Sequence, residues 1–320
     1  MNYLYHYCNN VKCFNIIQSE SIRLYDIGKS NDYGELKMFY PEIFSCLREY
    51  YFKAPFPFNY NGMKNEDAFI ELLDGVQHIW EERFYTGEFS SFVICFSEES
   101  DLLSQWREYS DDGRGGCIGF SHEILQNFCK ESGNVLRLEK IEYLTEEQIN
   151  YKLEMVVIEI LDILKTLRQW IVDNMTHDDK DDNTDGLLSF NFSVMLENFF
   201  IDSLRYKAIG FKEEKEWRLF INNYAYKNPE WVCGSIDEIE YGSNGFKETI
   251  DFLKNKIEFT ITSDDLIPYL PLDFNESKNN IFEELRIGPK NKIRESDIKL
   301  FMAMNGYNEI NITYSNISYR

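Results

Sequence analysis

Short apolar runs, most of them bounded by turn-forming residues, recur along the chain and predict a β-sheet. In the first run, YLYHYC, alternation places His6 on the same face as Leu4 and Cys8, opposite three tyrosines. SSFVICFS, at 90–97, has the continuous β-branched and aromatic character of a buried strand. Further strands are predicted at 22–27, 117–121, 214–222, 257–262, 281–289 and 310–317.

Helical periodicity dominates elsewhere. Apolar residues recur at helical spacing through 145–174, and a second helix is predicted at 187–206. Residues 38–83 are also helical in pattern, with a break at APFPFNYNG, where two prolines and an Asn-Gly pair forbid a regular helix. No low-complexity linker divides the chain, so we expect one α+β domain over 1–320, with a central, mostly antiparallel sheet and a largely helical insertion at about 145–209.

Composition narrows the class of protein. Hydrophobic residues make up 43% of the chain, enough to build a core, while a formal net charge of -22 argues against a broad nucleic-acid-binding face. The seven cysteines are scattered without a CxxC pair, which suits reduced thiols in a cytoplasmic protein and predicts no metal site. We also expect no signal peptide and no membrane-spanning segment.

The segment EKEWRLF is the first candidate for chemistry. In a strand, Glu214, Glu216 and Arg218 share one face, and the opposite face is apolar. Two interpretations stay open. The charged face is either a solvated ion pair on an outer strand, or the wall of a pocket where a carboxylate stabilises a cationic transition state.

The segment DLLSQWREYSDDGRGG is the second candidate. Ser100 and Asp101 are expected to cap a helix whose apolar stripe includes Trp106 and Tyr109. Gln105 and Arg107 fall on the two flanks of this stripe, where they can face a cleft. Arg107 suits a phosphate or carboxylate group, although pairing with an acidic neighbour is the alternative.

Two weaker candidates are turns. Asn31 and Asp32 either form an Asx turn or line a ligand pocket. RIGPKNK, at 286–292, is a basic island in an acidic chain, either a phosphate site or an ordinary surface loop. No Walker loop, GxGxxG, GxSxG or HExxH motif is present.

Taken together, five segments resemble a widespread bacterial family known only as a domain of unknown function. They are LYHYCNN with the following FNIIQSESIRLYDIGKSND, FSEESDLLSQWREYSDDGRGGCIGFS, FKEEKEWRL, RIGPKN and the terminal SNISYR. This resemblance extends over nearly the whole chain but implies no activity.

The chain also resembles ADP-ribosyltransferase-like folds, which open with a strand bearing His or Arg that grips NAD, then a short helix and a second strand. His6 matches the first position, Tyr25 on the second strand matches a ring-stacking aromatic, and Glu214-Lys215-Glu216 matches an E-x-E element. The SQWREY helix departs from that pattern. The resemblance implies an NAD-dependent ADP-ribosyltransferase or NAD-cleaving enzyme, with His6 and Glu216 as main catalytic candidates and Glu214 and Tyr25 beside them.

The same resemblance implies NAD as substrate, with Trp106 as a second ring-stacking candidate and Arg107 at the pyrophosphate. The full set of expected NAD contacts is Gln105, Trp106, Arg107, Tyr109, Asn31, Asp32 and Arg218. A protein acceptor and a role in bacterial stress or phage defence go with this expectation. Two alternatives stay open. One is a nucleotide or phosphoryl-ligand sensor that uses the same Arg/His pocket without turnover, and the other is a structural interaction protein.

Overall fold

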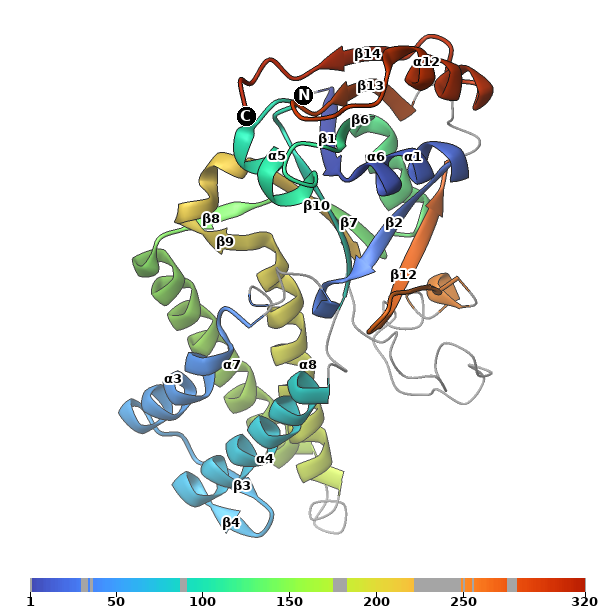
Figure 1. Ribbon diagram of the computed structural model, residues 1–320. Helices are drawn as coiled ribbons and strands as arrows, with labels where there is room; N and C mark the ends of the chain where they lie inside the picture. Colours follow the sequence, from blue (N-terminus) through green and yellow to red (C-terminus); the bar gives the residue numbers. More distant parts are fainter. Residues whose placement is uncertain are drawn as a thin grey trace. The chain divides into compact units, whose positions relative to one another are not determined.

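The computed structural model (Figure 1) describes residues 2–29, 34, 37–86, 91–174, 183–221, 249, 251–254, 256–274 and 281–319. The chain divides into two compact units. Unit 1 comprises 1–30, 91–142 and 210–320, and unit 2 comprises 31–90 and 143–209. The helical insertion predicted at about 145–209 therefore lies in unit 2, together with the helical region 38–83. Folding of the whole chain as a single domain stays a prediction.

Unit 1 is built on an open, mostly antiparallel sheet, which confirms the predicted fold class. The strand order is β11-β12-β2-β5-β1-β6-β13-β14, and β10 joins β5 to β7. Of the pairs described in this sheet, only β13–β14 is parallel. The strands are β1 (Tyr3–Cys8), β2 (Ser21–Asp26), β5 (Phe92–Ser97), β6 (Gly116–Ser121), β7 (Leu136–Lys140), β10 (Glu216–Ile221), β11 (Glu258–Ile261), β12 (Leu266–Asp273), β13 (Phe282–Ile287) and β14 (Asn311–Tyr314).

One face of this sheet packs against helices and forms the core of unit 1. Alternation directs Leu4 of β1, Phe96 of β5 and Leu219 of β10 into the same buried cluster. Ile17 and Leu125 enter the cluster from the helices α1 and α6, which Figure 1 draws close to the sheet. The helices of unit 1 are α1 (Asn10–Ser19), α5 (Leu103–Tyr109), α6 (His122–Glu131) and α12 (Glu295–Met304), with short 3-10 helices η1 (Ile27–Lys29) and η4 (Ile209–Glu214) at its boundaries.

Strand β12 was not among the predicted strands, and its sequence shows why. LIPYLPLD contains two prolines, which normally keep a segment out of a sheet interior because proline donates no hydrogen bond. Pro268 nevertheless pairs in register with Phe259 of β11, and Pro271 pairs with Arg23 of β2.

Unit 2 is mainly helical, as its periodicity predicted. Its aromatic core includes Trp80 and Phe200, whose rings meet at 4.9 Å, and Tyr51 stacked on Phe69. The predicted break in the helical region after 53 is confirmed, and two short strands lie between the flanking helices. The elements are α3 (Tyr40–Lys53), β3 (Asn59–Tyr60), β4 (Met63–Lys64), α4 (Asn65–Thr86), β8 (Glu142–Leu144, at the unit boundary), α7 (Glu146–Asn174), α8 (Asn183–Asp202), η3 (Ser203–Arg205) and β9 (Tyr206–Ala208).

Candidate functional site

Strands β1 and β2 share one edge of β5 and separate from each other there. β1 pairs with β5 at Tyr5 and Ser97, whereas β2 pairs with β5 at Val93 and Phe92. In the described chain no strand pairing covers this edge at Cys95 between them. We call this gap the fork. A buried carbonyl at such a gap needs another hydrogen-bond donor.

His6 supplies that donor. Its Nδ1 lies 2.8 Å from the backbone oxygen of Cys95, and its ring meets Phe96 edge to face at 5.9 Å. A carbonyl oxygen only accepts, so Nδ1 carries the proton in this contact and Nε2 is left with its lone pair. Burial lowers the pKa of His6 to about 4, although the hydrogen bond to the Cys95 carbonyl acts in the opposite direction and raises it. His6 is therefore a neutral imidazole at pH 7.

Strand β10 brings the acidic pair to the fork, although not in the predicted geometry. The strand begins at Glu216, Glu214 ends the 3-10 helix η4, and Lys215 between them has φ 46°. The prediction of one continuous strand with both carboxylates on one face was therefore wrong, because this left-handed residue breaks the alternation. Glu214 is still buried, and so is Glu216.

Glu216 is paired with a buried arginine. Arg218 Nε donates to Glu216 Oε1 at 2.6 Å and Nη2 to Oε2 at 3.2 Å. Arg218 is completely buried, and β10 lies between β5 and β7, so the interpretation as a solvated pair on an outer strand was wrong. A buried, bidentate pair of this kind fixes the carboxylate in position.

Helix α5 contributes two further side chains, Gln105 and Tyr109, to the same place. Gln105 is buried, Tyr109 is half-buried, and Arg107 is exposed. The predicted cap was wrong: Leu102 is the N-cap residue and no side chain caps the helix. Asp101 instead accepts a hydrogen bond from Trp106 Nε1 at 2.7 Å, which draws the indole into the interior.

These elements enclose a cavity of about 50 Å³ beside the fork. The lining residues are His6, Tyr7, Cys95, Phe96, Gln105, Tyr109, Glu214 and Glu216. Five of the predicted site residues therefore meet, from segments up to 210 residues apart (216 − 6). Arg218 does not line the cavity but contacts Glu216, which does. The polar side chains of the lining include the carboxylates of Glu214 and Glu216 and the imidazole of His6, so the cavity suits a small, neutral or cationic group that brings its own donors.

Other predicted site residues lie elsewhere. Trp106 is completely buried and packs edge to face on Tyr7 at 4.8 Å, so its ring is used within the fold. Tyr25 packs on Tyr269 at 5.6 Å and is not a lining residue. Arg107 also does not line the cavity. Asn31 and Asp32 lie outside the described residues. Sequence reasoning missed Tyr7, Cys95 and Phe96 as lining residues, since their strand patterns indicated only burial.

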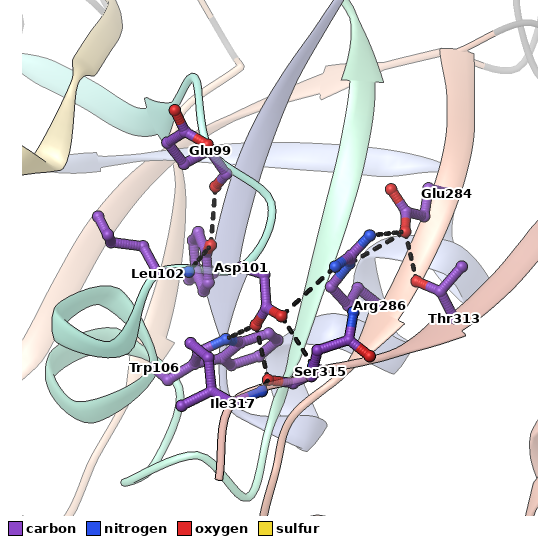
Figure 2. A network of polar contacts seen from close by, with 11 residues as sticks. Glu99, Asp101, Leu102, Trp106, Glu284, Arg286, Thr313, Ser315 and Ile317 are labelled. Carbon is purple, nitrogen blue, oxygen red and sulfur yellow. Dashed lines mark hydrogen bonds and ion pairs between the residues drawn. The ribbon is translucent and has the colours of Figure 1, made fainter. Parts of the chain in front are cut away.

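A polar network that includes Trp106 of α5 is centred on Asp101 (Figure 2). Asp101 Oδ1 accepts from Trp106 Nε1 and, at 2.6 Å, from Ser315 Oγ, while Oδ2 accepts from the backbone N–H of Asn316 at 2.8 Å. Arg286 Nη1 lies 3.5 Å from Asp101 Oδ2, and its Nη2 donates to Glu284 at 2.8 Å. The network therefore joins α5, β13 and the segment after β14.

The basic island of 286–292 belongs to the same side of unit 1. Arg286 is paired within the network, and Lys290 donates to Asp112 at 2.9 Å. Tyr319 also donates to Asp112, and Lys290 lies over its ring. These contacts fit the surface-loop interpretation of the island better than a phosphate site, because Arg286 and Lys290, two of its three cations, already have acidic partners.

The turn between α5 and β6 is shaped by close backbone contacts. A Cβ at Gly115 would lie 2.1 Å from the Cys8 oxygen, so only glycine fits there. The N–H groups of Gly288 and Lys290 donate to the oxygens of Gly115 and Gly113. The GRGG and RIGPKN segments thus fasten two parts of unit 1 to each other.

Residues 105–219 match the model of a protein family described as a protein of unknown function, DUF2971, which confirms the predicted resemblance to such a family over this stretch. No curated protein and no solved structure matches the chain. The matched stretch contains α5 from Gln105 onward, together with Glu214, Glu216 and Arg218, while His6 lies before it.

Two further findings concern the described residues alone. No group of three or more His, Cys, Asp or Glu side chains among them is arranged to bind a metal ion. None of their helices is both long enough and apolar enough to cross a membrane.

Proposed function

We propose that the cavity at the fork binds the nicotinamide end of NAD and that the protein cleaves its glycosidic bond, passing ADP-ribose to an acceptor or to water. The observation that supports this proposal is the convergence of His6, Gln105, Glu214 and Glu216 on one cavity. Carboxylates beside a neutral hydrogen-bond acceptor are suited to a sugar carbon that becomes positively charged as its leaving group departs.

Each residue has a separate task in this proposal. Glu216, fixed by Arg218, stabilises the positive charge on the ribose as neutral nicotinamide leaves with the bonding electrons. His6 binds the substrate by accepting a hydrogen bond at Nε2, because Nδ1 is used by Cys95. The acceptor, a protein in the first instance, would be chosen outside this cavity. Seven cysteines without a paired motif support a cytoplasmic location.

A specific observation also favours the second candidate, a nucleotide sensor without turnover. Glu216 is already in a buried ion pair, and an ion-paired carboxylate is a weaker stabiliser of developing charge than a lone one. A phosphoryl group does not suit the cavity, because Arg107 is exposed and does not line it, while the carboxylates of Glu214 and Glu216 do. In this candidate function, the sugar or base portion of the nucleotide would occupy it.

The test is nicotinamide release from NAD by the purified full chain, with cell lysate supplied as acceptor. Glu216→Gln and His6→Ala should each abolish release while preserving the circular dichroism spectrum. Glu213→Gln and His78→Ala change exposed residues of the same types and should leave release unchanged. Binding of NAD without release in any preparation would reject the enzyme and favour the sensor, and neither binding nor release would reject both.

A further inference from the structure

Gln105 has an unusual environment for an amide side chain. It is only 8% exposed, it lines the cavity, and its side chain makes no hydrogen bond with any residue that the structure describes. A buried amide normally has partners, because leaving it without them costs free energy comparable to a lost hydrogen bond. The missing partner of Gln105 is therefore expected to be something that enters the cavity.

The groups that face Gln105 restrict what can enter. His6 presents a lone pair at Nε2, while Glu214 and Glu216 contribute carboxylates to the same lining. A negatively charged group would meet these carboxylates and would bring no hydrogen for His6. The entering group must therefore carry N–H or O–H donors and no negative charge.

The size of the cavity limits the group further. One water-sized group needs roughly 10–15 Å³, so about 50 Å³ admits about three to five such groups. A primary carboxamide has three heavy atoms, two N–H donors and one acceptor. It is the group whose donors and acceptor match both the amide of Gln105 and the lone pair of His6.

We propose that Gln105 is a specificity-determining residue that selects a primary carboxamide, that of nicotinamide, over the corresponding carboxylate. The inference rests on the proposed function for its choice of ligand. The Gln105 Nε2–H group donates to the carboxamide oxygen, and Gln105 Oε1 accepts from one of its N–H groups. The second N–H donates to His6 Nε2. A carboxylate forms at most the first of these three contacts.

Binding of nicotinamide and of nicotinate to the full chain at pH 7 tests this selectivity by calorimetry, without requiring turnover. We expect nicotinamide to bind at least about tenfold more tightly than nicotinate, the ratio that one unmade hydrogen bond gives. Gln105→Leu should weaken nicotinamide binding about tenfold and clearly reduce the preference, leaving only the part that comes from His6 and the two carboxylates. Gln126→Leu, which changes an exposed glutamine of α6, is the matched control and should keep it.

The inference and the proposed function can fail separately. Equal binding of the two ligands by the wild-type protein, or an unchanged preference in Gln105→Leu, overturns the role of Gln105. The second assay compares nicotinamide release from NAD with nicotinate release from nicotinic acid adenine dinucleotide. Release from both at similar rates supports the enzyme and rejects the selectivity, whereas a binding preference without any release supports the selectivity and rejects the enzyme.

Discussion

The cavity at the fork and the Asp101 network both border α5, yet they treat buried polar groups in opposite ways. Both carboxylate oxygens of Asp101 accept hydrogen bonds, and Arg286 lies beside them. In the cavity, Gln105 and His6 Nε2 meet no hydrogen-bond partner among the described residues. A satisfied network rigidifies a fold, while unmet polar groups around a cavity indicate a ligand. The network therefore supports the fold, and the cavity is the better candidate for function.

The pair Glu216–Arg218 stands between these two cases, because it is satisfied and also borders the cavity. Replacing Arg218 by Met leaves the Glu216 carboxylate buried without its partner. We expect a loss of about 3–5 kcal/mol in the free energy of unfolding at pH 7, the usual cost of removing one member of a buried pair. Urea unfolding followed by circular dichroism measures this loss.

The double variant Glu216→Gln/Arg218→Met is the control for that experiment. It removes both charges, so it should recover much of the stability that Arg218→Met loses. If the single and double variants are equally unstable, the arginine acts through packing and not through its charge. The pair would then not fix the carboxylate at the cavity.

A second prediction concerns the protonation of His6. Burial lowers the pKa of His6 to about 4 in the folded chain, whereas an unfolded histidine has a pKa of about 6.5. Below pH 6.5 the unfolded chain therefore binds a proton that the folded chain does not. Stability is complete above pH 6.5 and falls as the pH decreases toward 4, by about 3 kcal/mol at most.

The measurement compares wild type with His6→Gln by urea unfolding at pH 7 and pH 4.5, since other groups titrate equally in both proteins. The wild-type advantage at pH 7 should shrink or reverse at pH 4.5. A difference that does not change with pH would mean that His6 is protonated alike in both states. Its Nε2 would then not be the neutral acceptor that the cavity requires.

The third prediction tests the satisfied network. Asp101→Asn removes the charge that faces Arg286 and disturbs the contacts with Trp106 and Ser315, with an expected loss of about 2 kcal/mol at pH 7. Burial opposes ionisation of Asp101, but hydrogen bonds from Ser315, Asn316 and Trp106 and the charge of Arg286 outweigh it and lower its pKa. The contribution is therefore present above the unfolded pKa of about 3.9 and is lost as the pH falls through the lower folded value.

Chemical denaturation of Asp101→Asn at pH 7 and pH 3 checks both parts of this prediction. The variant should be less stable than wild type at pH 7, and the difference should narrow as the pH falls toward 3. Nicotinamide binding by the folded variant should stay within about twofold of wild type, because Asp101 does not line the cavity. A tenfold loss of binding would make the network part of the site.

The sequence predicted much of the sheet because its strands carry their burial in their own residues. Alternation in β1 and the continuous apolar run of β5 need no knowledge of their neighbours. β12 was not predicted because its two prolines suggest a loop. The geometry of the acidic segment was predicted wrongly because the alternation of residue types does not reveal that Lys215 has a left-handed backbone conformation. Local patterns report local conformation, and these features depend on what surrounds them.

The candidate site was predicted in its residues more than in its arrangement. His6, Gln105, Glu214 and Glu216 do meet at one cavity, as a pocket built from these segments requires. Whether Trp106 faced a ligand or the core was decided by Asp101, five residues earlier, which bonds the indole nitrogen. The partner of Cys95 was equally hidden, because the gap between β1 and β2 arises only from the pairing of three strands.

The smallest predicted effect belongs to Tyr7, which is the residue common to both regions. Its hydroxyl donates to the Glu99 oxygen at 2.7 Å and accepts from the Leu102 N–H at 3.1 Å, while its ring packs on Trp106 and lines the cavity. Burial raises its pKa, so the phenol stays protonated and able to donate throughout the neutral range. Tyr7→Phe keeps the ring and removes only the two hydrogen bonds, with an expected loss of about 1 kcal/mol in unfolding free energy.

Nicotinamide affinity of Tyr7→Phe decides how far the two regions are separate. If the start of α5 is fixed mainly by Asp101, the helix keeps its place and the affinity changes less than about twofold. A loss of affinity much larger than the loss of stability would show that the hydroxyl positions Gln105 by anchoring Leu102 at the N-cap of its helix. Tyr7 would then both stabilise the fold and position a residue of the cavity.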